Sequence, residues 1–174
     1  ADDIRDFQIE GMSVGDNLLD YFSEEEINKK KKADYPRSRR FSRVSFSSPK
    51  FEIYDLVEFH IKTEDKNYII YAVMGDMHFE NDFKGCMKKK KEIVSDIESS
   101  LTNFKKKSYE SKYKMDDGKS IAEITDFRFV DESSIRVFCA KFSKISKTKR
   151  DLEDVLSVSI SSKEIKDWIS NEAY

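Results

Sequence analysis

Two cysteines are the residues whose type and number most directly predict chemistry in this 174-residue chain. Cys86 and Cys139 leave one possible pairing, and an even number of cysteines is typical of disulfides in exported proteins. Cys86 falls in the first turn of an expected helix and Cys139 in an expected strand, each on the apolar face of its element. We predict a disulfide, with two separate buried thiols as the alternative. The bond would close a loop of roughly 50 residues and stabilise the fold by about 4 kcal/mol.

The first residues of the chain indicate export. Ala1-Asp2-Asp3 stands where an initiator methionine would otherwise be, and a small residue followed by acidic residues is typical of a chain after signal-peptide cleavage. We therefore expect a periplasmic or secreted protein that is made with a signal peptide. No run of about 18 apolar residues is present, so we expect no transmembrane segment.

A serine-hydrolase motif is present, but its partners are not. Residues 11–15, Gly-Met-Ser-Val-Gly, match G-x-S-x-G, and such a serine needs a histidine and a carboxylate to activate it. The two histidines, His60 and His78, fall on expected strands rather than on a loop near the C-terminus. We therefore interpret Ser13 as the N-cap of a helix. Residues 118–120, Gly-Lys-Ser, lack the first glycine of a phosphate loop and are interpreted as a turn.

A metal site is the remaining route to catalysis. In the expected hairpin His78 faces Glu52, and an imidazole with a carboxylate can hold zinc. Zinc sites usually contain more histidine or thiolate than this, and an exposed cross-strand His–Glu pair explains the same two residues. His78 and Glu52 are thus the candidate ligands of a metal-dependent hydrolase.

A group of arginines forms a second candidate site. Four of them lie close together between residues 37 and 43, interleaved with aromatic residues, as in a polyanion-binding groove. They are Arg37, Arg39, Arg40 and Arg43. This group has acidic neighbours, and 32 basic residues against 34 acidic ones give the whole chain a net charge of −2. That balance creates no general field for nucleic acid, so nucleic acid is not an expected partner.

Apolar spacing and capping residues predict the helices. Ser23 with Glu26 forms a capping box, and Asn81 or Asp82 caps the longest apolar stripe. The expected helices cover residues 14–32 (two short helices or one bent helix), about 83–102, and a terminal segment capped by Ser161.

Alternating apolar residues predict the strands. The expected strands cover about residues 4–10 (or an extended arm), 40–47, 51–62, 68–78, 121–130, 135–142 and 155–160. In the hairpin after residue 51, Lys62 is expected opposite Tyr68, so that Phe59 faces Tyr71. Residues 105–120 are lysine-rich and are expected to form a polar connection that ends in a turn.

The order of elements predicts an α+β fold in which helices cover one or more antiparallel sheets. We expect one domain over residues 1–174, built from two helix-plus-three-strand meander units, about 11–80 and 81–174, and a C-terminal helix. The pattern leaves open whether the two units form one sheet or two.

Two segments resemble a known family. Residues 4–22, which read Ile-Arg-Asp-Phe-Gln-Ile-Glu-Gly-Met-Ser-Val-Gly-Asp-Asn-Leu-Leu-Asp-Tyr-Phe, and the tail from Leu156 to Tyr174 resemble a family of small exported bacterial proteins of unknown function. The resemblance implies a signal peptide and brings no known active site. Gly11-Met12-Ser13 and the element order are also similar to small envelope modules of the β-barrel-assembly lipoprotein and β-lactamase-inhibitor types, where a helix pair packs on an antiparallel sheet.

The residues favour a non-catalytic binding or protein-interaction module, because no nucleophile, base or ligand set converges in the sequence. The expected partner is a protein or a small molecule, and no cofactor is expected. A metal-dependent hydrolase using His78 and Glu52, and a polyanion-binding protein using the four arginines, are the alternatives.

Overall fold

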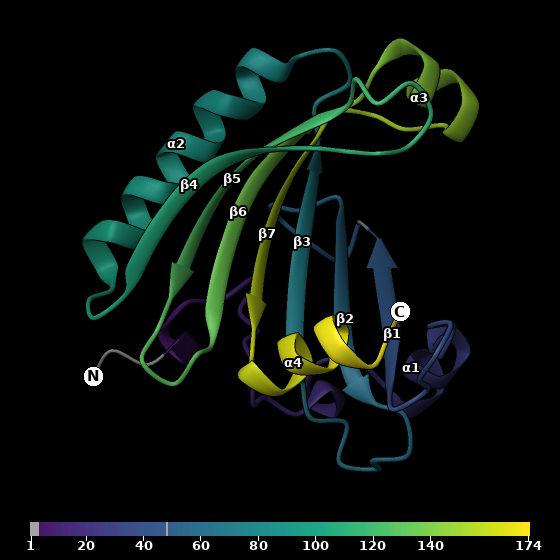
Figure 1. Ribbon diagram of the computed structural model, residues 1–174. Coiled ribbons are helices and arrows are strands. Elements are labelled where there is room, and N and C mark those ends of the chain that lie inside the picture. Colours follow the sequence, from purple (N-terminus) through teal and green to yellow (C-terminus); the bar gives the residue numbers. More distant parts are fainter. Residues whose placement is uncertain (1–3, 48) are drawn as a thin grey trace.

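The computed structural model describes residues 4–47 and 49–174 and contains one seven-stranded antiparallel sheet (Figure 1). The strands lie in the order β1-β2-β3-β7-β6-β5-β4. Their bounds are β1 Phe41–Ser47, β2 Leu56–Lys62, β3 Ala72–His78, β4 Lys105–Lys112, β5 Ile121–Arg128, β6 Ser134–Lys141 and β7 Val155–Ser161. The predicted α+β class is confirmed. Both units contribute to the same sheet, and the second unit supplies four strands rather than three.

Each α-helix begins at a side chain that accepts a backbone hydrogen bond. The helices are η1 Ile4–Asp6, η2 Leu18–Asp20, α1 Glu24–Lys30, α2 Phe83–Ser100, α3 Lys144–Arg150 and α4 Lys163–Asn171, where η marks a 3-10 helix. The predicted capping box of Ser23 and Glu26 is present at α1, and Asp82 caps α2. Ser162, one residue beyond the predicted Ser161, caps α4. These caps satisfy N–H groups that a first turn leaves without partners.

The pairing of β3 with β7 joins the two halves of the sheet. Val73 lies opposite Ile160, and Gly75 lies opposite Val158. β7 is the last strand along the chain, yet it occupies the centre of the sheet between β3 and β6.

One face of the sheet carries the main core. α2 packs on this face against β6 and β7, and the buried residues of η1, η2 and α1 (Ile4, Leu18 and Ile27) belong to the same cluster. The strand residues of this cluster are Val44, Phe46, Val57, Phe59, Ile61, Val73, Met77, Phe127, Ile135, Val137, Cys139, Leu156, Val158 and Ile160. Because burying each large apolar side chain contributes about 1.5–3 kcal/mol, this face supplies most of the hydrophobic stabilisation.

α4 covers one end of the opposite face. Ile165 and Trp168 are fully buried there against Phe41 and Ala72, and the indole Nε1 of Trp168 donates to Ser38 Oγ at 2.8 Å. Figure 1 shows α4 across the lower ends of the central strands and α3 beyond their upper ends, with the middle of β3 and β7 in view between them.

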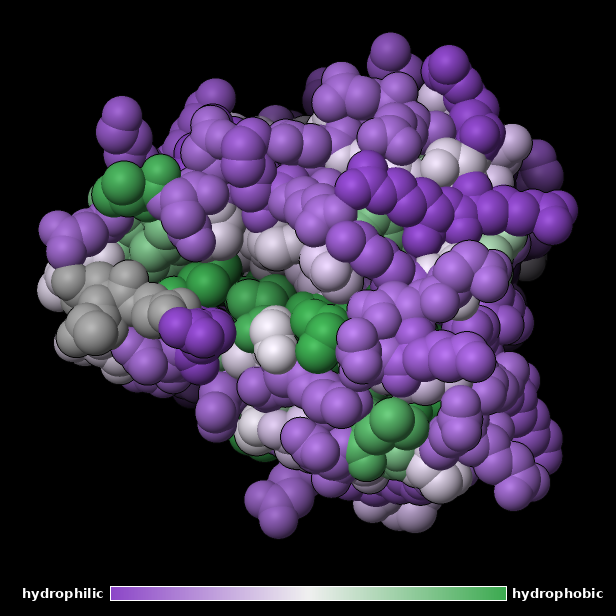
Figure 2. All heavy atoms as spheres, turned by 90° about the horizontal axis from the view of Figure 1, so that it is seen from below, coloured by the Kyte–Doolittle hydropathy of each residue, from purple (hydrophilic) through white to green (hydrophobic). Residues whose placement is uncertain are grey.

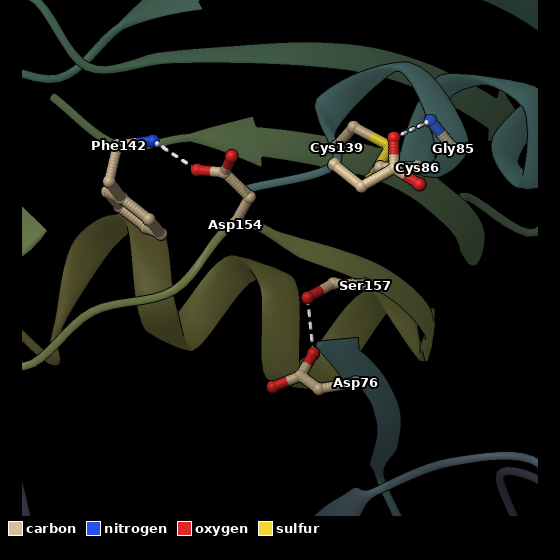
Figure 3. Close-up of a disulfide and its surroundings, with 8 residues drawn as sticks. Asp76, Gly85, Cys86, Cys139, Phe142, Asp154 and Ser157 are labelled. Carbon is tan, nitrogen blue, oxygen red and sulfur yellow. Dashed lines mark hydrogen bonds between the residues drawn. A yellow bond between two sulfur atoms is a disulfide. The ribbon is translucent and has the colours of Figure 1, made fainter. Parts of the chain in front are cut away.

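The predicted disulfide is present. Cys86 of α2 and Cys139 of β6 are bonded, with their Cα atoms 6.1 Å apart and a sequence separation of 53 (Figure 3). Both cysteines are fully buried. The bond therefore ties α2 to the face of the sheet that it covers.

The N-terminal segment differs from the prediction. Residues 4–10 form the short helix η1 and one isolated bridge at Ile9 instead of a strand. The N–H of Ser13 donates to Asp16 Oδ2 at 2.8 Å, as in half of a capping box. The chain then runs into η2, which is capped by Asn17, so Ser13 caps no helix. Two short helices follow, η2 and α1, separated by a few residues.

The first hairpin is shorter than predicted and shifted by two residues. β2 begins at Leu56 rather than at residue 51, and Phe59 lies opposite Val73 rather than Tyr71. Residues 68–70 pair with the N-terminal segment instead: Tyr68 O accepts from Leu18 N–H at 2.9 Å. A shift of two residues keeps every side chain on its predicted face, because side chains alternate with a period of two.

Besides η1, the strand β4 and the helix α3 were not predicted. β4 occupies the lysine-rich segment that was expected to be a polar connection, and it pairs with β5 along its whole length. α3 is held against the loop at residues 113–120 by Asp116, which accepts from Ser146 Oγ at 3.0 Å and pairs with Arg150 Nε at 2.8 Å. β4 and α3 are held by contacts with other segments of the chain, and neither has a pattern of apolar residues that would predict it from the sequence.

Candidate functional site on the open face of the sheet

The candidate site lies on the sheet face opposite α2, in the part between α3 and α4, and we call this part the open face. The strand register assigns to this face the side chains that alternate with the main core. These are Leu56, Glu58, Met74, Asp76, Ile124, Asp126, Arg136, Phe138, Val155, Ser157 and Ser159, with Tyr109 on the edge strand β4. The surface thus mixes apolar, aromatic and hydrogen-bonding groups.

Two half-buried carboxyl groups lie near the middle of the open face. Glu58 accepts a hydrogen bond from Ser45 Oγ at 2.9 Å, and Asp76 accepts one from the hydroxyl of Ser157 (Figure 3). Asp76 lies opposite Leu56, two residues from Glu58, so the two carboxyl groups are diagonal neighbours. Burial raises the pKa of both groups, and the charge of Asp76 adds to the effect on Glu58. A proton is therefore retained on these groups to higher pH than on exposed carboxyls.

His60 lies at the α4 end of this face and belongs to the packing there. Its Nε2 is 2.6 Å from the hydroxyl of Tyr35, and either group can be the donor, depending on the histidine tautomer. Burial lowers the pKa of His60 to about 4, helped by the positive charge of Arg43, and burial raises the pKa of Tyr35 to about 12. The ring of Tyr35 packs edge-on against Trp168, with centroids 4.6 Å apart. His60 is therefore a neutral packing residue held by one hydrogen bond rather than a free base.

A second polar cluster lies on the β4–β6 half of the open face. Arg136 binds Asp126 through Nε at 2.6 Å and Nη2 at 3.0 Å, and the Tyr109 hydroxyl donates to Asp126 Oδ2 at 3.0 Å. Two-point contacts of this kind fix the orientation of a guanidinium. The cluster holds Tyr109 and Arg136 rigidly at the surface.

The four arginines of the predicted anion site do not converge on one groove. Arg37 Nη1 donates to the main-chain oxygen of Tyr174 at 2.7 Å, and Arg40 pairs with Glu164 of α4. Arg39 is exposed and forms no ion pair within the described part of the chain. Arg37 and Arg40 therefore fasten the C-terminal segment to the residues just before β1.

Arg43 is the member of that group that borders the open face. Its Nη2 pairs with Asp34 at 2.6 Å, and its Nη1 is 3.5 Å from Glu58 Oε2. The guanidinium is about one third exposed. Arg43 therefore joins the central carboxyl pair to the outer edge of the sheet.

The two candidate metal ligands have different partners in the structure. His78 lies beside Asp55, whose Oδ2 accepts the His78 N–H at 2.8 Å and lies 4.0 Å from Nδ1. Glu52 lies in the loop before β2, where its N–H donates to Glu10 Oε2 at 3.1 Å. Within residues 4–47 and 49–174, no group of three or more His, Cys, Asp or Glu side chains could hold a metal ion.

The serine motifs are structural. Ser13 is 1% exposed, and its hydroxyl has no hydrogen-bond partner among the described residues, so it is not presented to a substrate. Gly118 lies in a turn at a positive φ of 66°, as predicted. Ser120 is buried and donates to Ser146 Oγ at 3.2 Å beneath α3.

A separate hollow of about 470 Å³ opens at the lower end of the molecule. Its floor is apolar and its rim is charged: the lining includes Ile4, Val14, Ile69, Ile70, Tyr71, Asp131, Lys163 and Glu164. Figure 2 shows this end from below, with hydrophobic side chains gathered in the middle and hydrophilic ones around them. Lys163 at the rim pairs with Glu132 and Asp167, each at 2.7 Å, so its charge is already neutralised.

Glu58 and Asp76 were missed by the sequence reasoning. Both occupy polar positions of alternating strands, which predict solvent exposure. Their partners, Ser45 and Ser157, come from neighbouring strands, and Ser157 lies 81 positions away in the sequence. The sequence feature that could have indicated these two residues is a carboxylate at a polar strand position, with a serine at a polar position of another strand.

No helix within the described residues is long and apolar enough to cross a membrane. Comparison of the chain with protein-family models, with curated proteins and with solved structures gives no match.

Proposed function

We propose that the protein is an exported, non-catalytic binding module that engages a partner through the open face. The observation that carries the proposal is the composition of this uncovered face. Aromatic residues, methionine and arginine are the types enriched in protein interfaces, and Tyr109, Phe138, Met74 and Arg136 contribute all three to one surface. These side chains project from one continuously hydrogen-bonded sheet, so little backbone ordering is needed on binding.

The bonding of the polar groups supports binding rather than catalysis. Glu58 and Asp76 each accept a serine hydroxyl, and His60 is bonded to Tyr35. A catalytic base must reach the proton of a nucleophile or a substrate. These groups are instead used to hold neighbouring strands and the C-terminal helix in place.

The disulfide supports export. Disulfides persist in oxidising compartments and are rare in reducing ones, and this bond lies in the core. Periplasmic or secreted localisation is the setting in which the Cys86–Cys139 bond is maintained.

Site-specific photocrosslinking tests the binding surface. A photoreactive phenylalanine derivative is placed at Met74 or Phe138 on the open face, and at Lys88, an exposed position of α2, as the control. Each folded variant is irradiated with a periplasmic or culture-medium extract of the cells that produce it. We expect one adduct of defined mass from positions 74 and 138, suppressed by excess unlabelled protein.

The control decides between specific and general contact. Adducts that form equally from position 88, or that unlabelled protein does not suppress, would mean that the open face is not the binding surface. Adducts from no position would reject the proposal for that extract, and turnover of a substrate that requires Glu58 or Asp76 would replace it with an enzymatic one.

A further inference from the structure

The outer edge of β1 has backbone groups that bond to none of the residues that the structure describes. Arg43 exchanges two hydrogen bonds with Lys32, from Lys32 N to Arg43 O at 2.8 Å and from Arg43 N to Lys32 O at 2.9 Å. Hydrogen-bonding directions alternate along a strand, so the N–H and C=O groups of Ser45 and Ser47 also point outward from the sheet. No described residue bonds to these groups. An edge of this kind is a template for one more strand.

A groove of about 580 Å³ lies along this same edge. α1 and the residues just after it form one wall, and the β1 side chains on the open-face side form the other. The lining residues are Glu26, Lys29, Lys30, Lys32, Arg43 and Ser45. The groove therefore occupies the place that a strand added beside β1 would take.

The groove carries an excess of positive charge. Glu26 is occupied by Lys50 and by the capping box with Ser23. Among the described residues, no carboxylate forms an ion pair with Lys29 or Lys30, although the Lys30 ammonium lies 5.5 Å from the ring of Phe46. The exposed ammonium groups are thus available to negative charges on a ligand.

We propose that an extended, acidic segment of a partner protein binds in this groove and adds a strand to the sheet beside β1. The backbone of this segment bonds to the backbone groups of Ser45 and Ser47. It lies on the same side of β1 as Lys32, which bonds to Arg43. Its carboxylates lie against Lys29, Lys30 and Lys32. In such strand addition the backbone supplies affinity, and alternate side chains supply specificity. The edge is a separate surface from the open face, and the two proposals stand or fall independently.

Synthetic peptides test the chemistry of the occupant. The probe is a blocked seven-residue peptide of alternating glutamate and valine, titrated calorimetrically at low salt. One comparison peptide has lysine in place of glutamate, and another has proline in place of valine, which keeps the charge but breaks strand pairing. Inorganic triphosphate serves as an anion without a backbone. We expect only the glutamate–valine peptide to bind, with affinity that falls as salt is added.

Protein variants test the location. Lys29→Glu/Lys30→Glu reverses two charges in the groove, and Lys88→Glu/Lys91→Glu makes the same change on exposed positions of α2. We expect the groove variant to bind the peptide about tenfold or more weakly, because close charges across an interface are strongly coupled. The α2 variant should bind within about twofold of the unchanged protein. Amide hydrogen exchange at Ser45 and Ser47 should slow when the peptide is bound.

Several results would overturn the inference. Equal binding of the proline peptide or of triphosphate would make the groove a general anion site without strand addition. If the α2 variant bound the peptide as weakly as the groove variant, the loss of binding would come from the net charge of the protein and not from the groove. No binding of the glutamate–valine peptide at low salt, or unchanged exchange at Ser45 and Ser47, would exclude the added strand.

Discussion

The ring of Tyr54 lies directly over Gly75 in the middle of β3. A Cβ added at Gly75 would be 2.5 Å from Tyr54 Cδ1 and 2.6 Å from Cγ. Cγ is the ring atom attached to the Cβ of Tyr54, so the ring cannot clear the space without moving the whole side chain. Tyr54 is itself 7% exposed and packed in the main core. Position 75 therefore requires a residue without a Cβ, because a Cβ would overlap the ring.

Gly75→Ala is expected to destabilise the protein by about 1–3 kcal/mol, the usual cost of overpacking a core. Urea unfolding measures the effect. In a Tyr54→Leu background the same substitution should cost less, because the contact atoms of the ring are gone. An equal cost in both backgrounds would mean that the ring is not the obstacle.

Removing the disulfide is expected to lower the free energy of unfolding by up to about 4 kcal/mol, since the bond closes a long loop in the unfolded chain. The comparison is between the oxidised protein and Cys86→Ala/Cys139→Ala in urea. Thiol titration of denatured, unreduced protein should find no free thiol in the unchanged chain. Two free thiols per chain would contradict both the bond and the support that it lends to export.

The protein is expected to lose stability as pH falls from about 6.5 to about 4. The unfolded chain protonates His60 near its ordinary pKa of 6.5, whereas burial lowers the pKa in the folded state to about 4. The unfolded state therefore binds more protons at this residue across the window. The contribution of His60 alone lowers the free energy of unfolding by about 3 kcal/mol. The raised pKa values of Glu58 and Asp76 act in the opposite direction and favour the folded state as they protonate.

Urea unfolding at neutral and at mildly acidic pH checks this expectation. His60→Gln keeps a hydrogen-bonding group near Tyr35 but cannot titrate, and it should remove the histidine part of the loss. If the variant and the unchanged protein lost the same stability on acidification, the titration would belong to another group.

Glu10→Gln is expected to destabilise the loop before β2. The Glu10 carboxylate accepts the N–H groups of Glu52, Ile53 and Tyr54 at 3.1, 2.7 and 2.9 Å. Partial burial raises the pKa of Glu10, but the three hydrogen bonds together outweigh it and leave the pKa lowered. Hydrogen bonds to a charged acceptor are stronger than neutral ones, so the loss should be about 1–3 kcal/mol.

Hydrogen exchange provides the direct measurement for Glu10→Gln. The amides of Ile53 and Tyr54 should exchange faster in the variant, while those of the distant strand β5 should not change. Unaltered exchange at both loop amides would show that the carboxylate does not hold them.

Local sequence patterns predicted the helices that carry an apolar stripe and the strands in which apolar and polar residues alternate. α2 is capped by Asp82, one of the two predicted caps, and the β5–β6 hairpin lies within a residue or two of its predicted bounds. β4 was missed because its side chains are exposed or half-exposed along both sides. A lysine-rich edge strand has no apolar alternation, and it becomes a strand only because β5 offers it a partner.

The candidate site was less predictable than the fold because it depends on contacts between distant segments. His60 was placed correctly on a strand, but its buried contact is with Tyr35, which in turn packs against Trp168 of the C-terminal helix. The displaced start of β2 likewise follows from Glu10, more than forty residues earlier in the chain. No local pattern encodes either contact.

The central position of β7 governs the order in which this sheet can be completed during folding. β1–β3 and β4–β6 are consecutive along the chain and can each form a meander from nearby residues. Until Val155–Ser161 is in place, β3 and β6 both have an unpaired side, and the two meanders share no strand. Pairings between such distant segments slow folding and leave strand edges exposed to other chains in the interval. Completion of the sheet therefore depends on the pairing of β7 with both meanders.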